Sequence, residues 1–260
     1  MDELKQAINT MCRHYDEPLR LDDLARVATM SKFHFLRTFS HETGVTPARY
    51  LCAIRIQAAK RLLLSTSLDV AQISYQVGYG SLGTFTTRFT ELVGFPPVRF
   101  RRLARGEASM PATGGETDDE PADPAPLSGT VSGTVEVTRP ITRSIMLGLF
   151  PTRIPQGQPV ACTTVSGPGR WRMDGVPPGT WHLLGVTVLD DMRGIPGQVP
   201  FLVATPQRLR VRPRESVRTD ILLRPVHWTD PPLLVALPGV DALITAPPQA
   251  SPARQVSAVR

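Results

Sequence analysis

Residues 21–44, LDDLARVATMSKFHFLRTFSHETG, and residues 70–94, VAQISYQVGYGSLGTFTTRFTELVG, follow one pattern, and this repeated pattern decides the fold. Each stretch predicts a short helix, a turn and a second helix. The second helix of each carries two phenylalanines four residues apart, which places both rings on one helical face. The chain therefore contains a duplicated two-helix unit.

The ends of the second helices are marked by residues that favour such positions. Ser31 and Ser81 stand where an N-cap is expected, because a serine hydroxyl can accept a hydrogen bond from an early helical amide. Gly44 and Gly94 fit the left-handed residue that ends a helix.

Two further helices are expected in this half of the chain. Pro47 can open a helix in its first turn, and apolar residues recur at helical spacing over residues 48–64. These seventeen residues predict a helix about 25 Å long that links the two units. Another helix is expected over residues 2–15, where Cys12 belongs to the apolar stripe.

Burial of the phenylalanine pairs leaves the opposite face of each second helix directed outward. This face comprises Lys32, Phe33, Leu36, Arg37 and Ser40 in the first unit, and Leu82, Gly83, Thr86 and Thr87, with Arg88 at the edge, in the second. A helix face of this kind can enter the major groove of DNA. The alternative is an ordinary surface on which Phe33 and Leu36 are partly exposed apolar residues.

Basic residues outside these two helices suit contacts with phosphate groups. They are Arg99, Arg101, Arg102 and Arg105 after the second unit, and Arg55, Lys60 and Arg61 on the linking helix. The alternative for both groups is that the charges are solvated or paired within the chain.

Charge divides the chain into three parts. Residues 1–106 carry fifteen lysines and arginines against nine acids, and residues 127–260 carry fourteen against eight. Residues 107–126 hold six acids, no base and many prolines and glycines, which predicts a flexible acidic linker. The basic balance on either side suits a polyanionic partner such as nucleic acid.

The duplicated stretch resembles the DNA-binding domain of the AraC/XylS family of bacterial transcription regulators. The resemblance is carried by LA..A..S..HFLRTF....G.TP..YL....I..A..LL in the first half and by I...VGY.S...F...F....G..P...R in the second. It covers about 85 residues, a third of the chain. It implies an all-α double helix-turn-helix domain whose two recognition helices read successive major-groove segments of a non-palindromic site.

The resemblance also implies which residues touch DNA. Base contacts fall to Phe33, Leu36 and Arg37 in the first recognition helix, and to Leu82, Gly83, Thr86 and Thr87 in the second. Phosphate contacts fall to Ser31, Lys32, Ser40, Ser81, Arg88, Arg99, Arg101 and Arg102. Arg37 suits a bidentate contact with guanine, and Phe33 and Leu36 suit thymine methyl groups.

Three residues depart from the family pattern. Thr29 stands where the first turn often has glycine, Thr87 stands where the second recognition helix often has arginine, and Gly83 offers no side chain to a base. We therefore expect the first recognition helix to dominate sequence discrimination. The domain order also differs, because the family usually places the DNA-binding domain last.

The second half of the chain predicts an antiparallel β-sandwich. Seven short alternating segments, separated by turn signals such as Pro177-Pro178-Gly179, lie in about 95 residues. The phrase GRWRMDGVPPGTWHLLGVTV, together with SGTVSGTV, resembles the transthyretin-like sandwich of carboxypeptidase regulatory domains. Trp171 and Trp181 lie on adjacent segments and are expected to form a cross-strand pair, either within the core or as a platform for a carbohydrate or another polar ligand.

These observations predict a multidomain chain, α then β. The expected parts are a DNA-binding domain over 1–106, a linker over 107–126, a sandwich over 127–228 and a partly disordered tail over 229–260. The expected function is a cytoplasmic transcription regulator or activator that binds double-stranded DNA. Its sandwich senses a small-molecule effector, self-associates or contacts a partner, and RNA polymerase is a further candidate partner.

Other function classes find little support in the residues. No catalytic triad, paired carboxylates, phosphate loop or metal-ligand spacing stands out, and His182 and His227 have no partners at ligand spacing. The three cysteines are too scattered for a disulfide framework or a zinc site, and Cys12 and Cys52 are expected to be buried. No cofactor, signal peptide, membrane span or enzymatic activity is expected, although an enzyme fused to a DNA-binding domain stays the less favoured alternative.

Overall fold

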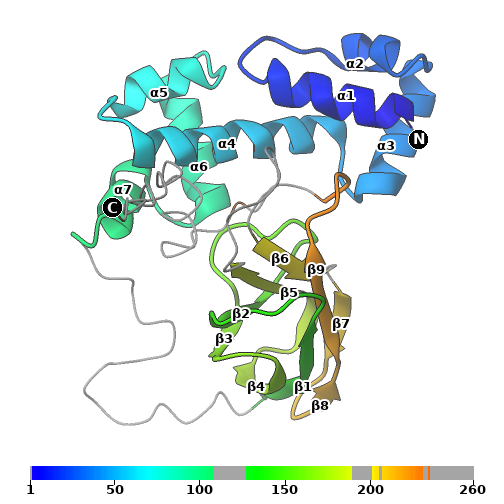
Figure 1. The fold of residues 1–260 in the computed structure, drawn as a ribbon, viewed down its shortest axis with the longest axis vertical. Coiled ribbons are helices and arrows are strands. Elements are labelled where there is room, and N and C mark those ends of the chain that lie inside the picture. Colours follow the sequence, from blue (N-terminus) through cyan, green and yellow to red (C-terminus); the bar gives the residue numbers. More distant parts are fainter. Residues whose placement is uncertain (1, 108–126, 189–200, 205–206, 231–233, 235–260) are drawn as a thin grey trace, which may run out of the picture.

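The computed structural model describes residues 2–107, 127–188, 201–204, 207–230 and 234. The predicted linker, apart from Glu107, and most of the predicted tail lie outside these residues. A helical domain is followed by a β-barrel, which lies beside the long helix α4 and its neighbours (Figure 1). In the described part of the chain, no helix is both long and apolar enough to cross a membrane.

Seven helices form the N-terminal domain. They are α1 (Asp2–Arg13), α2 (Leu21–Val27), α3 (Lys32–Thr43), α4 (Pro47–Ser65), α5 (Val70–Gln76), α6 (Leu82–Val93) and α7 (Pro97–Ala104). The predicted helix-turn-helix pairs are therefore confirmed as α2–α3 and α5–α6. Helix α7 follows α6 as α4 follows α3, so each unit contains three helices.

The phenylalanine pairs form the centre of each unit. All four rings are fully buried, and the rings within each pair lie 5.5 and 5.6 Å apart. The third helix of each unit adds one aromatic side chain: Tyr50 of α4 meets Phe39 edge-on at 5.4 Å, and Phe100 of α7 meets Phe89 at 5.7 Å. Offset and edge-on aromatic contacts of this kind stabilise a core beyond the area that they bury.

The predicted helix ends are confirmed. The backbone amides of His34 and Thr84 donate to the hydroxyls of Ser31 and Ser81, at 3.4 and 3.3 Å. Gly44 and Gly94 end α3 and α6 in the left-handed conformation, with φ of 73° and 92°.

The turns between the paired helices differ in the way that the sequence predicts. Gly78 occupies the second turn with φ of 81°, while Thr29 holds φ of 52° in the first. A positive φ is strained for a β-branched residue, because its side chain crowds the backbone. The first turn therefore carries strain that the second avoids.

One residue of this domain differs from the sequence-based expectation, and two basic residues of α4 follow the alternative of contacts within the chain. Cys12 is exposed, whereas Leu4, Ala7, Ile8 and Met11 form the buried face of α1. Lys60 is only 2% exposed and its ammonium lies 5.6 Å from the centre of the Phe100 ring, so it cannot reach a phosphate. Arg55 donates to the carbonyls of Tyr15 and Glu17 at 2.6 and 2.8 Å, which ties α4 to the α1–α2 connection.

The described residues of the second half form nine strands in one mixed sheet. They are β1 (Gly129–Val137), β2 (Ile145–Phe150), β3 (Ala161–Val165), β4 (Gly169–Val176), β5 (Gly179–Val188), β6 (Phe201–Ala204), β7 (Gln207–Val211), β8 (Ser216–Arg218) and β9 (Ile221–Pro225). The hydrogen-bonded order is β3-β2-β5-β6-β9-β1-β4, with β7 on β5 and β8 on β1.

The predicted antiparallel sandwich is wrong, and so is the transthyretin-like layout. The two longest strands each pair along one side with two short strands: β5 with β7 and β6, and β1 with β8 and β9. The β1 pairings with β8 and β9 are parallel. One sheet therefore curls on itself, and its end strands β3 and β4 are joined by the short turn 166–168, which gives a nearly closed barrel.

Gly133 allows β1 to pair with both β8 and β9. The connection between β8 and β9 crosses β1 at this residue, and a Cβ atom at Gly133 would lie only 1.8 Å from the carbonyl oxygen of Thr219. Next to it, the Asp220 carboxylate accepts from the amide and the hydroxyl of Thr134, at 2.7 and 2.6 Å. The close approach of these two backbones requires glycine.

The expected tryptophan pair does not form. Trp171 of β4 lies opposite Gly133 and is buried, while Trp181 of β5 lies opposite Leu209 and donates its indole N–H to the carbonyl of Pro177 at 2.8 Å. Strands β4 and β5 follow one another in the chain but have different partners in the sheet.

Candidate nucleic-acid interface

The outward face of α3 is open to solvent. Phe33 is 84% exposed and Leu36 is 36% exposed, and Arg37 beside them is exposed as well. A phenylalanine exposed to this degree costs solvation free energy, which a partner surface would recover. The three residues expected to touch bases thus lie together on one accessible face.

The outward face of α6 carries smaller side chains than that of α3. Leu82 is 41% exposed, Gly83 and Thr87 are exposed, and Thr86 is half-buried. Nothing lies within 4 Å of the place where a Cβ of Gly83 would be, so a backbone or a phosphate can approach the helix there. The outward face of α6 thus carries fewer large side chains than that of α3, and base discrimination mainly by the first helix stays a prediction.

The outward face of α3 and the edge of α6 border one hollow of about 350 Å³ between the units. Leu36 lines it from α3, and Thr84 and Arg88 line it from α6. Arg55 and Tyr79 line it as well, with the guanidinium 5.9 Å from the ring centre. Both recognition helices are therefore accessible from the same side of the domain.

The cations of this side differ in how they are engaged. Lys32 pairs with Asp22 at 3.0 Å and Arg88 pairs with Glu91 at 3.0 Å, and both pairs are exposed. Such pairs contribute little stability, so a phosphate can replace the carboxylate at small cost. Within the residues that the structure describes, Arg37 has no ion pair.

The remaining residues expected at phosphates are also accessible, with one exception. Ser31 and Ser81 are exposed, Ser40 is half-buried, Arg99 lies 5.1 Å from the centre of the Phe95 ring, and Arg102 is exposed. The exception is Arg101. It donates from Nε to the carbonyl of Leu63 at 2.9 Å and from Nη2 to that of Leu68 at 2.6 Å.

Arg101 therefore joins α7 to the end of α4, and the expectation that it anchors a phosphate is replaced by a structural role. Partial burial lowers the pKa of its guanidinium, and the nearby Arg105 adds to the effect. The sequence held a signal for this role. Arg101 is the last residue of the motif that the second unit shares with the family, and that motif also contains the buried phenylalanines Phe85 and Phe89.

We expect the neighbours Arg101 and Arg102 to respond differently to substitution. Arg101→Leu leaves two carbonyls without donors and should lower the free energy of unfolding by about 1–3 kcal/mol. Arg102→Leu should leave stability unchanged and weaken binding to all DNA sequences, with a shallower salt dependence. Urea unfolding and binding titrations at several salt concentrations measure both effects. Equal loss of stability in the two variants would contradict this assignment.

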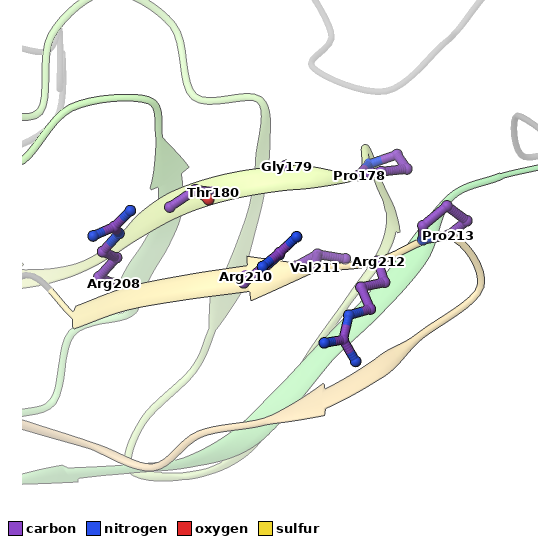
Figure 2. Close-up of a pocket in the computed structure, with 8 residues that line it drawn as sticks. All are labelled: Pro178, Gly179, Thr180, Arg208, Arg210, Val211, Arg212 and Pro213. Atoms are coloured by element: carbon purple, nitrogen blue, oxygen red, sulfur yellow. The ribbon is translucent and has the colours of Figure 1, made fainter.

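The barrel carries a separate basic surface, shown in Figure 2. Arg208 and Arg210 alternate along β7 with the buried Leu209 and Val211, so their side chains share the outer face, and Arg212 comes directly after the strand. They line a hollow of about 600 Å³ with Thr180 of β5 and with Pro178 and Pro213 at one end. We call these three arginines, together with Thr180, the β7 arginine face.

The residues that could bind a metal ion or act as a nucleophile are scattered in the described parts of the chain. No group of three or more histidines, cysteines, aspartates or glutamates there is arranged to hold a metal ion. Although Cys12 is exposed as a residue, partial desolvation raises the pKa of its thiol, and the charge of Arg61 opposes this only in part. A raised pKa disfavours the thiolate that a reactive cysteine needs.

The helical domain is similar to known proteins. Residues 24–103 match the family model described as a helix-turn-helix domain. They span α3 and α6 with their buried pairs and outward faces. The N-terminal domain is thus a double helix-turn-helix DNA-binding domain of the AraC family of transcription regulators.

Three curated relatives illustrate the match. The uncharacterized regulator YdeC of Bacillus subtilis is 31% identical over 100 residues, which are 38% of this chain and 34% of the relative. The regulator Rv1931c of Mycobacterium tuberculosis is 40% identical over 83 residues, 32% of each protein. The bifunctional transcriptional activator/DNA repair enzyme AdaA of B. subtilis is 33% identical over 95 residues, 36% of this chain and 45% of the relative.

The chain spans between about a third and a half of the length of these relatives. Among solved structures, the DNA-binding domain of the global transcriptional factor AdpA, in complex with a target DNA, is similar with 27% identity and a TM-score of 0.39. That similarity covers 42% of this chain and 100% of the AdpA domain.

Proposed function

We propose that the protein is a transcription regulator that binds double-stranded DNA at specific, non-palindromic sites. Helices α3 and α6 enter successive segments of the major groove from one side of the duplex. The observation that carries this proposal is the pairing of fully buried phenylalanines with accessible outward faces in both units, around one shared hollow. Relatives of this domain that are named as transcriptional regulators support it.

The two helices contribute unequally in this proposal. Arg37 binds a guanine edge through two hydrogen bonds, and Phe33 and Leu36 pack on thymine methyl groups. Leu82 adds an apolar contact, Gly83 admits the backbone, and the threonines of α6 hold position. Lys32, Arg88, Arg99 and Arg102, with the serines at the helix starts, neutralise or bind phosphates.

Selection of preferred sites from random DNA tests the proposal directly. The full chain should enrich one asymmetric site with two conserved segments, and binding to that site at physiological salt should exceed binding to unrelated DNA by about a thousandfold or more. Enrichment of no site, or equal affinity for all sequences, would exclude specific regulation. A palindromic site would instead indicate that two copies bind as a symmetric dimer.

We further propose that the barrel senses a ligand, and that the ligand is an anion rather than a neutral carbohydrate. Trp171 is buried, and the ring of Trp181 packs against the barrel core and over Gly179, so neither provides a free stacking platform. On the β7 arginine face, Arg208 and Arg210 have no ion pair among the described residues. Arg212 has its carboxylate partner, Glu215, only at 4.0 Å.

The electrostatic field of the β7 arginine face supports this choice. His182 lies opposite Arg208 in the sheet, and burial together with the charges of Arg153 and Arg208 lowers the pKa of its imidazole. Side chains two residues apart on a strand are separated by about 7 Å. The face therefore suits a molecule with several anionic groups in a row.

Titration calorimetry with tripolyphosphate and with citrate, at constant ionic strength, tests the anion site. We expect binding by the full chain and at least about tenfold weaker binding by the Arg208→Ser/Arg210→Ser variant, since each charge-assisted hydrogen bond contributes roughly 1.5–3 kcal/mol. The Arg139→Ser/Arg170→Ser variant loses the same charge elsewhere on the barrel and serves as the control. Equal weakening in both variants would indicate unspecific attraction.

A further inference from the structure

The connection between β2 and β3, residues 151–160, leaves the barrel and meets the helical domain. The amide of Gly157 donates to the carbonyl of Leu92, near the end of α6, at 2.7 Å. The glycine that follows α6 is in contact as well, since a Cβ at Gly94 would lie 3.2 Å from the carbonyl carbon of Gly157. We call residues 151–160 the bracket loop.

The bracket loop makes an equivalent contact with the first unit. The guanidinium of Arg153 lies against Gly44, where a Cβ atom would be 2.6 Å from its Nε. Gly44 and Gly94 end α3 and α6 and occupy the same position in the two units. One short loop therefore touches the corresponding ends of both recognition helices.

Burial anchors the bracket loop in the helical domain. Ile154 is 5% exposed and belongs to the apolar core of the helices rather than to that of the barrel. The hydroxyl of Thr152 donates to the carbonyl of Ile154 at 2.7 Å, which holds the turn that presents this side chain. Removing this apolar side chain from water stabilises the contact between the loop and the helices.

A second contact follows β9. The hydroxyl of Tyr50 lies 3.3 Å from the carbonyl oxygens of both Trp228 and Asp230. Arg224 holds the carboxylate of Asp230 through two hydrogen bonds of 2.7 and 2.9 Å. Because Tyr50 also packs on Phe39 beneath α3, this contact reinforces the position of the barrel against the first unit.

The barrel contacts leave the DNA-reading residues uncovered. Phe33, Leu36 and Arg37 lie in the first half of α3 and stay exposed in the full chain, whereas the bracket loop lies at its other end. A helix of twelve residues is about 18 Å long. DNA and the bracket loop can therefore occupy opposite ends of the recognition helices at the same time.

We propose that the bracket loop fixes the position of the two recognition helices relative to each other, and so sets the spacing between the two DNA segments that the protein reads. Arg153, Ile154 and Gly157 are positioning residues in this role, since none of them touches DNA. The inference rests on the proposed function. Helix α4 also links the units, and the bracket loop adds a second connection at the far ends of α3 and α6.

A spacing series tests this role with the full-length protein. One base pair is inserted or removed between the two segments of the site selected by the wild-type chain, which moves them by about 3.4 Å and about a tenth of a turn. The wild type should lose about tenfold or more in affinity at each wrong spacing. The Arg153→Ala/Ile154→Ala variant should lose only about threefold or less, because its helices adjust.

Controls separate positioning from damage to the fold. Val160→Ala truncates an exposed aliphatic residue of the same loop and should keep the wild-type profile, and Arg153→Ala alone, at an exposed residue, should flatten the profile in part. Circular dichroism checks that the helices remain folded. Loss of affinity by the same factor at every spacing, or an unchanged profile, would overturn the inference and leave α4 as the only link. A wild-type chain that selects no site would overturn the proposed function as well.

Discussion

Replacing Arg37 with alanine should lower affinity for the preferred site by about 10- to 100-fold, while affinity for unrelated DNA changes little. A bidentate contact between arginine and guanine contributes about 1–3 kcal/mol of discrimination, and alanine cannot replace it. Arg37 is exposed and unpaired among the described residues, so no ion pair within the protein has to break before it binds. Selection from random DNA should show relaxed preference at one or two adjacent positions of the segment read by α3.

Two control variants distinguish a base contact of Arg37 from a phosphate contact. Arg102→Leu should lower affinity for the preferred site and for unrelated DNA by the same factor, because a phosphate contact carries no sequence information. Arg170→Ala removes an exposed charge from β4 and should change neither affinity. If Arg37→Ala behaved like Arg102→Leu, Arg37 would be a phosphate contact and base discrimination would have to come from Phe33 and Leu36.

The two turns of the helix-turn-helix units should respond in opposite directions to exchange of their central residue. Gly78→Ala should lower the free energy of unfolding by about 2–4 kcal/mol, since alanine is strained at φ of 81° and its Cβ would lie 2.6 Å from the backbone oxygen of Asp16. Thr29→Gly should raise it by about 1 kcal/mol, because glycine adopts φ of 52° without strain.

Urea unfolding followed by the helical circular dichroism signal measures both changes. Gly80→Ala is the matched control, because Gly80 lies two residues after Gly78 and nothing is within 4 Å of its Cβ position. A stable Gly78→Ala protein would mean that the α1–α2 connection moves away without cost. A destabilised Thr29→Gly protein would mean that the hydrogen bond from the Thr29 hydroxyl to the Ala28 carbonyl outweighs the backbone strain.

The helical half could be predicted from the sequence because its information is local. Apolar spacing, capping serines and terminal glycines lie within a few residues of the features that they determine. The same locality made the outward faces of α3 and α6 predictable, since burial of the phenylalanine pairs fixes which residues remain outside. The contacts of Lys60 and Arg101 within the chain could not be predicted, because their environment comes from α7 meeting α4, which side-chain spacing within one helix does not encode.

The barrel half could be predicted only as a series of strands. Alternating apolar residues line the interior of a barrel and of a sandwich alike, so the pattern does not distinguish them. What distinguishes them is the pairing of β1 with β8 and β9, about 85 residues further along the chain. The role of the bracket loop could not be predicted either. Ile154 lies among prolines, glycines and polar residues, and it packs on core residues of the helical domain that precede it by up to 150 positions in the sequence.

The parallel pairing of β1 with β9 also orders events on the ribosome. Strand β1 begins at Gly129, but its neighbour β9 ends at Pro225, so the barrel cannot close until nearly a hundred further residues have been synthesised. Helix α7 is complete at Ala104, and domains fold as units from the N-terminus during translation. A nascent chain can therefore fold its helical domain before the barrel that carries the bracket loop is complete.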